Sequence, residues 1–172
     1  MSMEALQERI GYRFHDKALL ERALIHSSYA NESRQKIECN ERMEFLGDAV
    51  LSIIVADHIF HKFHLAEGDL TRIRASLVCE KSLFEFAQKI QLGQELLLGH
   101  GEEQTGGRER PSVVSDAFEA LIAGIYLDGG LEAAQRFVLP FVEEDLTHVV
   151  KFIQRYVSIY IQSLLQIKIF QR

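Results

Sequence analysis

The chain has 172 residues, of which 47% are hydrophobic, and carries a formal net charge of −6 at pH 7. This length and apolar content suffice for one domain with a single core, and only 2 Pro and 11 Gly favour long helices over a turn-rich β fold. The charge lacks the basic excess typical of nucleic-acid binders, no apolar run reaches transmembrane length, and residues 1–10 lack an apolar signal-peptide region. We therefore expect a cytoplasmic, mainly helical protein.

Acidic and basic residues are unevenly distributed. Residues 151–172 contain four basic residues and no acid, so residues 1–150 hold 15 basic and all 25 acidic side chains, a balance of −10. An acidic protein can still act on nucleic acid where bound cations bridge its carboxylates to phosphate. Cys39 and Cys79 are far apart in the sequence, which favours two reduced thiols over a disulfide framework or a zinc site.

Apolar residues at helical spacing predict a series of helices in the first 150 residues. They cover residues 3–10, 16–27, 41–63, 67–78, 81–90, 113–127 and 131–150. Asp16 is the expected cap of the second helix, and His26 at the end of that helix is expected to meet its last carbonyl groups. The glycine-rich residues 98–110 lack the Gly-Lys-Ser/Thr of a P-loop and are expected to form a flexible connection.

The helix expected over residues 41–63 is apolar on nearly all sides between Ala49 and Ala56. This pattern indicates burial on more than one side, either as a central helix or as a helix shared with a second subunit. His58, His61 and His64 follow at a spacing of three. Such histidines can bind a transition metal, but we interpret them as an ordinary helix end beside a loop.

Three acids lie in line with the expected core side of this helix. At 100° per residue, Glu41, Glu44 and Asp48 fall within about 60° of one face. Leu51 and Val55 continue the same stripe. The carboxylates are therefore not on a solvated face opposite the core.

A second pair of acids follows the same pattern in the helix expected over residues 113–127. Asp116 and Glu119 are three residues apart and share a face, which Ala123 and Tyr126 continue. Carboxylates on the packing side of two apolar helices are costly unless their charge is balanced, and a hard divalent cation balances several at once. An all-oxygen site favours Mg²⁺, with Mn²⁺ as the alternative, and such sites typically serve phosphoryl chemistry.

The sequence of residues 41–49, ERMEFLGDA, closely resembles the signature of bacterial ribonuclease III, the double-stranded-RNA endonuclease. Further segments are similar to that family in the same order, namely residues 23–28, 67–78, 106–108 and 115–122. The resemblance covers residues 4–149. It implies an all-α fold, the ribonuclease III endonuclease-domain helical fold, in residues 1–150, acting as a homodimer in which Phe45 inserts into the partner subunit.

The resemblance also implies a reaction. The expected activity is Mg²⁺-dependent cleavage of double-stranded RNA to 5′-phosphate and 3′-hydroxyl ends, in the processing of ribosomal, messenger and transfer RNA. On the matching positions, Glu44, Asp116 and Glu119 would bind the metal. Asp48 and Glu119 would be the catalytic pair, and Glu41 a supporting acid.

The chain departs from the family after residue 150. The bacterial enzymes continue into a double-stranded-RNA-binding domain, whereas residues 151–172 form an atypical basic, apolar tail that matches neither the linker nor that domain. We expect weaker, more salt-sensitive RNA binding, and no membrane is required. The tail is interpreted as a terminal helix on the domain or as truncated or frame-shifted sequence, with a membrane-surface or partner helix as the alternative.

Two other functions remain open at this point. One is an RNA-binding or assembly protein of the same fold with little or no cleavage activity. The other is a structural helical dimer whose tail docks on a membrane or a partner. Loss of one of the five acids would favour the first of these alternatives, and none is lost.

Overall fold

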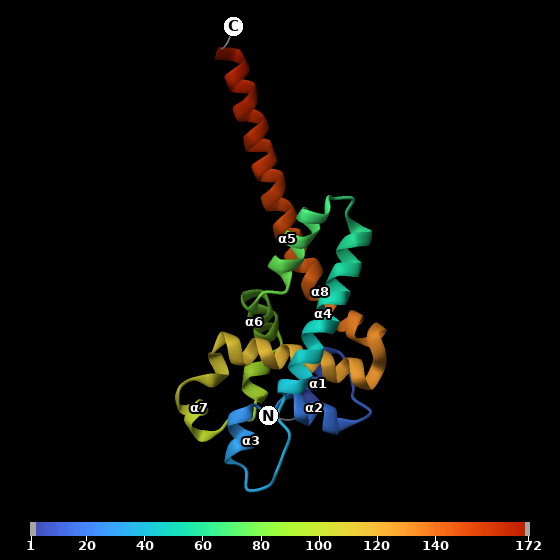
Figure 1. The fold of residues 1–172 in the computed structure, drawn as a ribbon, viewed down its shortest axis with the longest axis vertical. Helices are drawn as coiled ribbons and strands as arrows, with labels where there is room; N and C mark the ends of the chain where they lie inside the picture. The colour runs from blue at the N-terminus through green and yellow to red at the C-terminus, as the bar shows by residue number, and fades with distance from the viewer. Residues whose placement is uncertain (1–2, 171–172) are drawn as a thin grey trace. The chain divides into compact units, whose positions relative to one another are not determined.

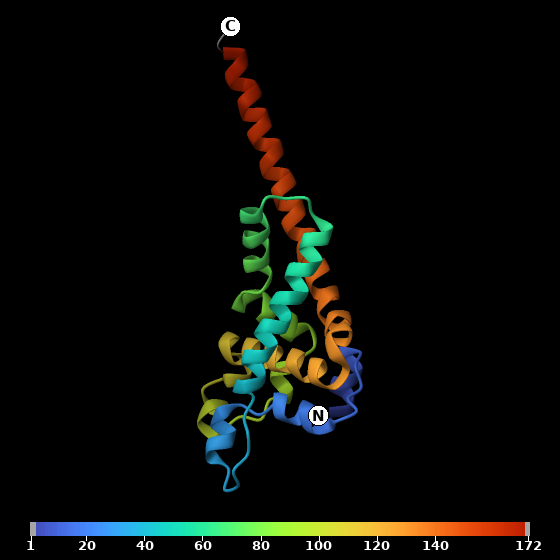
Figure 2. The same cartoon turned by 45° about the vertical axis from the view of Figure 1, so that its right-hand side comes forward.

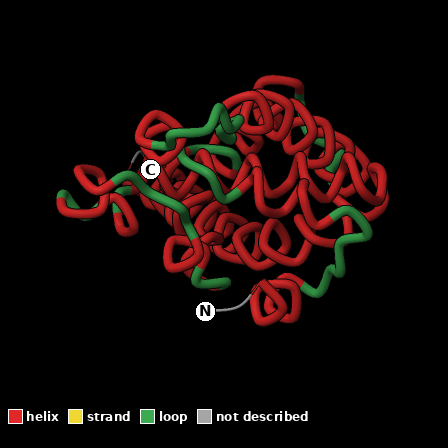
Figure 3. The backbone as a smooth tube through the Cα atoms, turned by 90° about the horizontal axis from the view of Figure 1, so that it is seen from below, coloured by secondary structure: helices red, strands yellow, loops and turns green. Residues whose placement is uncertain are grey.

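The computed structural model describes the backbone of residues 3–170 and the side chains of residues 3–147. Its helices are α1 (Met3–Ile10), α2 (Lys17–Ala23), α3 (Ser27–Glu32), α4 (Glu41–Lys62), α5 (Glu67–Leu77), α6 (Glu80–Lys89), η1 (Leu92–Glu95), α7 (His100–Gln104), η2 (Gly107–Glu109) and α8 (Pro111–Phe170). Apart from one isolated bridge between Ile25 and Leu97, these described residues form helices and loops only (Figure 3). The all-α prediction is confirmed.

The chain divides into two compact units, residues 1–139 and residues 140–172. In the second unit the helical backbone of α8 extends to Phe170, and the side chains from residue 148 onward, including the predicted tail, lie outside the described residues. The predicted division at residue 150 stays a prediction. No helix among the described residues is long and apolar enough to cross a membrane.

The first stretch of α8 is the most deeply buried part of the first unit. Phe118, Leu121, Ile122 and Ile125 are inaccessible to solvent, and the Phe118 ring packs against Phe86 of α6 at 6.0 Å between ring centroids. The interpretation of residues 41–63 as the central helix of the domain is therefore wrong. The central helix is the start of α8, because α6 packs against it and α4 crosses it (Figure 1).

Helix α4 is buried on one face and exposed to solvent on the other. Its buried face includes Leu51 and Val55, which the sequence had placed on the core side. Its opposite face exposes Phe45, Ile53 and Phe60, with 81%, 55% and 66% of their surface accessible. Helix α5 returns alongside α4 (Figure 2). The second interpretation of α4, a helix shared with another subunit, stays open.

A glycine allows α4 and α8 to touch. A Cβ atom added at Gly47 would overlap the backbone carbonyl group of Glu119. Immediately beside this crossing, Ala23, Met43, Ala120 and Ala123 form one core cluster of small and flexible side chains. The two helices therefore approach at backbone distance at the level of the predicted acids.

The prediction of a single helix over residues 16–27 is wrong. Asp16 caps α2 as expected, its carboxylate accepting from the Ala18 amide at 3.0 Å, but α2 ends at Ala23. The Leu24 carbonyl accepts from the Leu97 amide at 2.8 Å, and the His26 amide donates to the Leu97 carbonyl at 3.1 Å. These distant partners replace the helical hydrogen bonds. His26 is therefore the residue before α3 and not the end of α2.

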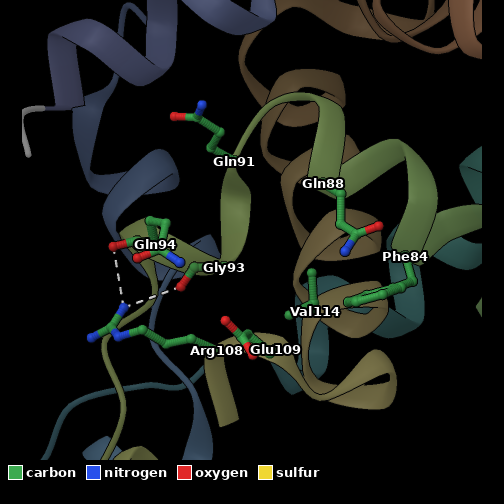
Figure 4. Close-up of a pocket in the computed structure, with 8 residues that line it drawn as sticks. All are labelled: Phe84, Gln88, Gln91, Gly93, Gln94, Arg108, Glu109 and Val114. Carbon is green, nitrogen blue, oxygen red and sulfur yellow. Dashed lines mark hydrogen bonds between the residues drawn. The ribbon is translucent and has the colours of Figure 1, made fainter. Parts of the chain in front are cut away.

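The prediction of a flexible connection over residues 98–110 is also wrong, because this segment holds two short helices, α7 and η2. Arg108 fixes it to the rest of the first unit. Its guanidinium donates to the carbonyl oxygens of Gly93, Gln94 and Leu96 at 3.1, 3.2 and 2.8 Å, and Figure 4 shows the first two of these bonds. Glu103 accepts from the same side chain at 2.7 Å.

The chain changes direction at Gly130, as the Asp128-Gly129-Gly130 sequence predicts. Gly130 has a φ of 77°, in the left-handed region that favours glycine, and it interrupts the helical dihedral angles of α8. Just before it, the nearly buried carboxylate of Asp128 accepts from the Tyr12 hydroxyl at 2.7 Å and from the amides of His15 and Asp16 at 2.9 Å each. Asp128 thereby ties the α1–α2 connection to α8.

Replacing Asp128 by alanine is expected to lower the free energy of unfolding by about 3 kcal/mol, because two amides and a hydroxyl lose a charged acceptor. Burial alone raises the pKa of Asp128, but the hydrogen bonds outweigh it and lower the pKa from 3.8 to about 2. The stabilisation is therefore complete above about pH 4 and is lost as the pH falls through about 2. Urea denaturation at neutral and acidic pH measures both effects. Asp69→Ala, on an exposed face of α5, is the control, and equal losses in the two variants would contradict the prediction.

Candidate metal centre

Three of the predicted acids converge at the crossing of α4 and α8. Carboxylate oxygens of Glu44, Asp116 and Glu119 all lie within 4.8 Å of one another. Each of these side chains is partly buried. Glu44 comes from the first turn of α4, Asp116 from the second turn of α8 and Glu119 from the third turn of α8.

The local sequence fixes both helix turns. Asn40 precedes α4, and its amide donates to the Ile25 carbonyl at 2.8 Å while its side-chain Nδ2 donates to the Ala23 carbonyl at 3.3 Å. Pro111 begins α8, where its missing N–H has no helical partner to lose. The buried Ser115 hydroxyl donates to the Ser112 carbonyl at 3.0 Å. The carboxylates therefore project from anchored helix starts.

The cluster has an electrostatic cost in the absence of a counter-charge. Burial first, and then the neighbouring charges of Asp48, Asp116 and Glu44, together raise the pKa of Glu119 from 4.5 to about 8. Burial likewise raises the pKa of Glu44, followed by the effect of the Asp116 charge, and burial raises the pKa of Asp116. Without a cation, the cluster therefore holds at least part of a proton at neutral pH.

This donor set fits a hard divalent cation. It offers only carboxylate oxygens, which Mg²⁺ and Mn²⁺ prefer, and includes no histidine or cysteine as softer metals require. A bound cation would also replace the missing counter-charge that the raised pKa values indicate. Within residues 3–147, no other group of three histidine, cysteine or acidic side chains converges in this way. His58, His61 and His64 do not converge on one point among these residues, and their interpretation as an ordinary helix end stays a prediction.

The other two predicted acids lie at the edge of the cluster. Asp48 and Glu41 are exposed, one turn to either side of Glu44 along α4. Their charges still reach the cluster, because both contribute to raising the pKa of Glu44. Their predicted roles as catalytic and supporting acids stay predictions.

Two residues near the cluster were not predicted. The exposed Glu80, in the first turn of α6, helps to raise the pKa of Asp116 after the larger effect of burial, whereas His26 acts in the opposite direction. Glu80 is a single acid at the start of its helix, without the paired spacing of the predicted acids, so the sequence gave no reason to select it. His26 is followed two residues later by Ser28, a spacing that suits a cap, but the apolar pattern before it indicated a continuing helix.

A separate hollow of about 510 Å³ lies beside α6 and Arg108 (Figure 4). Three glutamines, Gln88, Gln91 and Gln94, contribute to its lining. It contains none of the predicted site residues. Three of the predicted acids lie instead at the crossing of α4 and α8.

An all-helical fold with a carboxylate cluster where two helices cross is compatible with a nuclease domain that uses a divalent cation. The family model described as ribonuclease-III-like matches residues 16–146, and the chain belongs to this family. It is similar to the nuclease domain of ribonuclease III from Campylobacter jejuni, with a TM-score of 0.77 and 45% identity. That match covers 83% of this chain and 97% of that domain. The predicted ribonuclease III nuclease-domain fold is thus confirmed.

Curated relatives agree with this assignment. Ribonuclease 3 of Caldanaerobacter subterraneus subsp. tengcongensis is 48% identical over 147 residues, and ribonuclease 3 of Geobacillus kaustophilus is 48% identical over 156 residues. These matches cover 85% and 87% of this chain but 64% and 63% of the relatives. The chain therefore spans less than two thirds of the length of these relatives.

Proposed function

We propose that this chain is a Mg²⁺-dependent endoribonuclease that cleaves double-stranded RNA in cytoplasmic RNA processing. The observation that carries the proposal is the convergence of the Glu44, Asp116 and Glu119 oxygens within 4.8 Å. The matching ribonuclease 3 relatives and the matching nuclease domain support it. Residues 1–150 form the nuclease domain in this proposal, and residues 151–172 are a separate tail.

In the proposed site, the five acids have different tasks. Glu44, Asp116 and Glu119 hold the cation, which when bound would supply Lewis acidity toward the scissile phosphate. Asp48 and Glu119 orient the attacking water and accept its proton. Water adds to phosphorus and the 3′-oxygen leaves, which yields 5′-phosphate and 3′-hydroxyl ends. Glu41, exposed at the start of α4, supports the cluster through its charge.

Exposed basic side chains on the first unit suit a phosphate backbone. A hollow of about 620 Å³ adjoins Glu41 and includes Arg34 and Lys36 in its lining. Two further cations, Arg72 and Arg74, are exposed on α5. Since such contacts release counterions, RNA binding by this acidic chain would weaken as the salt concentration rises.

The proposed enzyme is a homodimer that joins through the bare face of α4. Phe45, Ile53 and Phe60 fall within about 80° of one another around this helix, and all three are exposed. Large exposed apolar side chains in one stripe are typical of protein interfaces. The solved nuclease domain from Campylobacter jejuni also has a region involved in dimer formation.

Replacing Phe45 by glutamate is expected to convert the dimer into a monomer, because a charge would be buried in the apolar seam. Since the Phe45 side chain is exposed within one subunit, the fold should be retained. Sedimentation equilibrium measures the mass, and circular dichroism checks the helix content. Leu127→Glu, at another exposed apolar residue, is the matched control and should stay dimeric. A monomeric wild type would contradict the proposed seam.

Cleavage of a long RNA duplex tests the proposed reaction. We expect the wild type to cut with Mg²⁺ and to leave 5′-phosphate ends, and Asp48→Asn to lose about a hundredfold or more in rate. Asp57→Asn, another exposed acid on α4, is the matched control. Binding of the duplex without any cutting would instead support the non-cleaving RNA-binding alternative.

A further inference from the structure

The segment that ends at His26 lies against both helix turns that carry the carboxylates. It is anchored through Asn40, whose Nδ2 donates to the Ala23 carbonyl at 3.3 Å. Ala23 in turn belongs to the same core cluster as Met43 and Ala120, each of which adjoins a cluster carboxylate in the sequence. His26 is therefore held beside the cluster by the backbone of the fold.

Hydrogen bonds also fix the His26 ring. The Ser28 amide donates to Nδ1 at 3.2 Å, and the Ser28 Oγ lies 2.8 Å from the same nitrogen. Because Oγ accepts from the Gly99 amide at 2.9 Å, its own proton is available to Nδ1. An Nδ1 that accepts these bonds carries no proton, so the neutral ring carries its proton on Nε2.

The Nε2–H group of His26 is a hydrogen-bond donor without a partner in the described part of the chain. Burial and the Glu80 charge raise the pKa of Asp116, and a positive charge on the His26 ring would lower it, so the ring lies within electrostatic range of that carboxyl. An oriented donor therefore lies beside the proposed cation site without being bonded to a carboxylate.

We propose that the Nε2–H group of His26 donates a hydrogen bond to a phosphate oxygen of the RNA strand held at the carboxylate cluster. This inference rests on the proposed function and names a substrate contact within it. Hydrogen bonds to charged groups contribute more binding free energy than hydrogen bonds between neutral groups. Loss of this donor should therefore lower the rate of cleavage about ten- to a hundredfold. The serine contacts keep the donor aimed before the RNA binds.

Two substitutions separate the donor from the structural role of His26. In His26→Asn, the side-chain oxygen takes the place of Nδ1 and asparagine is a strong cap residue, but the distal donor is lost. In His26→Gln, the side-chain amide reaches the place of Nε2, but the cap is lost. A purely structural role for His26 predicts that only the glutamine variant is impaired.

Cleavage of the RNA duplex with Mg²⁺ and thermal unfolding are measured for both variants. We expect His26→Asn to keep the melting temperature of the wild type and to lose about ten- to a hundredfold in kcat. His26→Gln should unfold at a lower temperature yet cleave faster than His26→Asn. The control is His64→Asn, at an exposed loop histidine, which should match the wild type. Wild-type cleavage by His26→Asn would overturn the proposal, as would equal rate losses in the two His26 variants.

A readout without catalysis distinguishes failure of this inference from failure of the proposed function. Nitrogen NMR of labelled histidines in the wild type, with Ca²⁺ in place of Mg²⁺, should show the Nε2–H tautomer for His26. Addition of a short RNA duplex should then shift that nitrogen and slow exchange of its proton. A wild type that binds RNA without cleaving it refutes only the proposed reaction. An unchanged His26 signal in RNA-bound protein refutes the contact.

Discussion

Gly47→Ala is expected to destabilise the fold by about 3 kcal/mol or more and to disperse the carboxylate cluster. The added methyl group would overlap the Glu119 backbone carbonyl, and neither helix backbone can yield as a flexible side chain would. Helices α4 and α8 must therefore move apart at the level of the carboxylates. Thermal unfolding and Mn²⁺ titration measure the two consequences.

The matched control for this glycine is Gly68→Ala on α5. Gly68 also lies in a helix, but it is exposed. A Cβ atom added there would lie 3.9 Å from its nearest neighbour, a guanidinium nitrogen of Arg72. Alanine there should leave the metal affinity unchanged and stabilise the helix by up to about 1 kcal/mol. Wild-type stability and metal affinity in Gly47→Ala would show that the two helices are not in backbone contact.

Glu119→Gln is expected to abolish most of the proposed cleavage, by about a hundredfold or more, because one residue serves both the cation and the attacking water. Loss of one carboxylate ligand should also weaken Mn²⁺ binding, which isothermal titration measures without RNA. Glu132→Gln, at an exposed residue of α8, is the control. If Glu119→Gln binds Mn²⁺ as tightly as the wild type, Glu119 is not a ligand of the proposed metal site.

The pH dependence gives the same residue a second signature. Burial first, then the neighbouring acids, raises the pKa of Glu119 from 4.5 to about 8, so the cation-free fold loses stability as the pH rises from 4.5 through about 8. Glutamine cannot lose a proton, so Glu119→Gln should be more stable than the wild type above about pH 8. The difference should vanish near about pH 4. Thermal unfolding in EDTA across this range measures it.

Cation binding should depend on pH in the opposite sense. A carboxyl that must release its proton binds a cation more tightly as the pH approaches its pKa, by up to about tenfold per pH unit. We therefore expect Mn²⁺ affinity of the wild type to rise until about pH 8, the pKa of Glu119. In Glu119→Gln this rise should be much smaller. A flat profile for the wild type would show that the cluster is already deprotonated.

The sequence by itself identified the acids that converge. Helical periodicity placed Glu44 on the core side of one helix and Asp116 and Glu119 on the core side of another, and burial of such charges demands a partner. These inferences succeed because the spacing of residues along one helix is a local property. The helix bounds of α4, α5 and α6 were likewise predicted to within two residues.

Only the tertiary structure decided the rest. Helix α2 ends at Ala23 because Leu97, more than seventy residues away, supplies the hydrogen bonds of the following segment. The pairing with Leu97 also makes His26 the N-cap of α3, on the segment that packs beside the carboxylate cluster. The raised pKa of Glu119 depends on packing against α4 at Gly47, which no spacing along a single helix reveals. Long-range backbone pairing and desolvation thus completed a site whose chemistry the local pattern had already indicated.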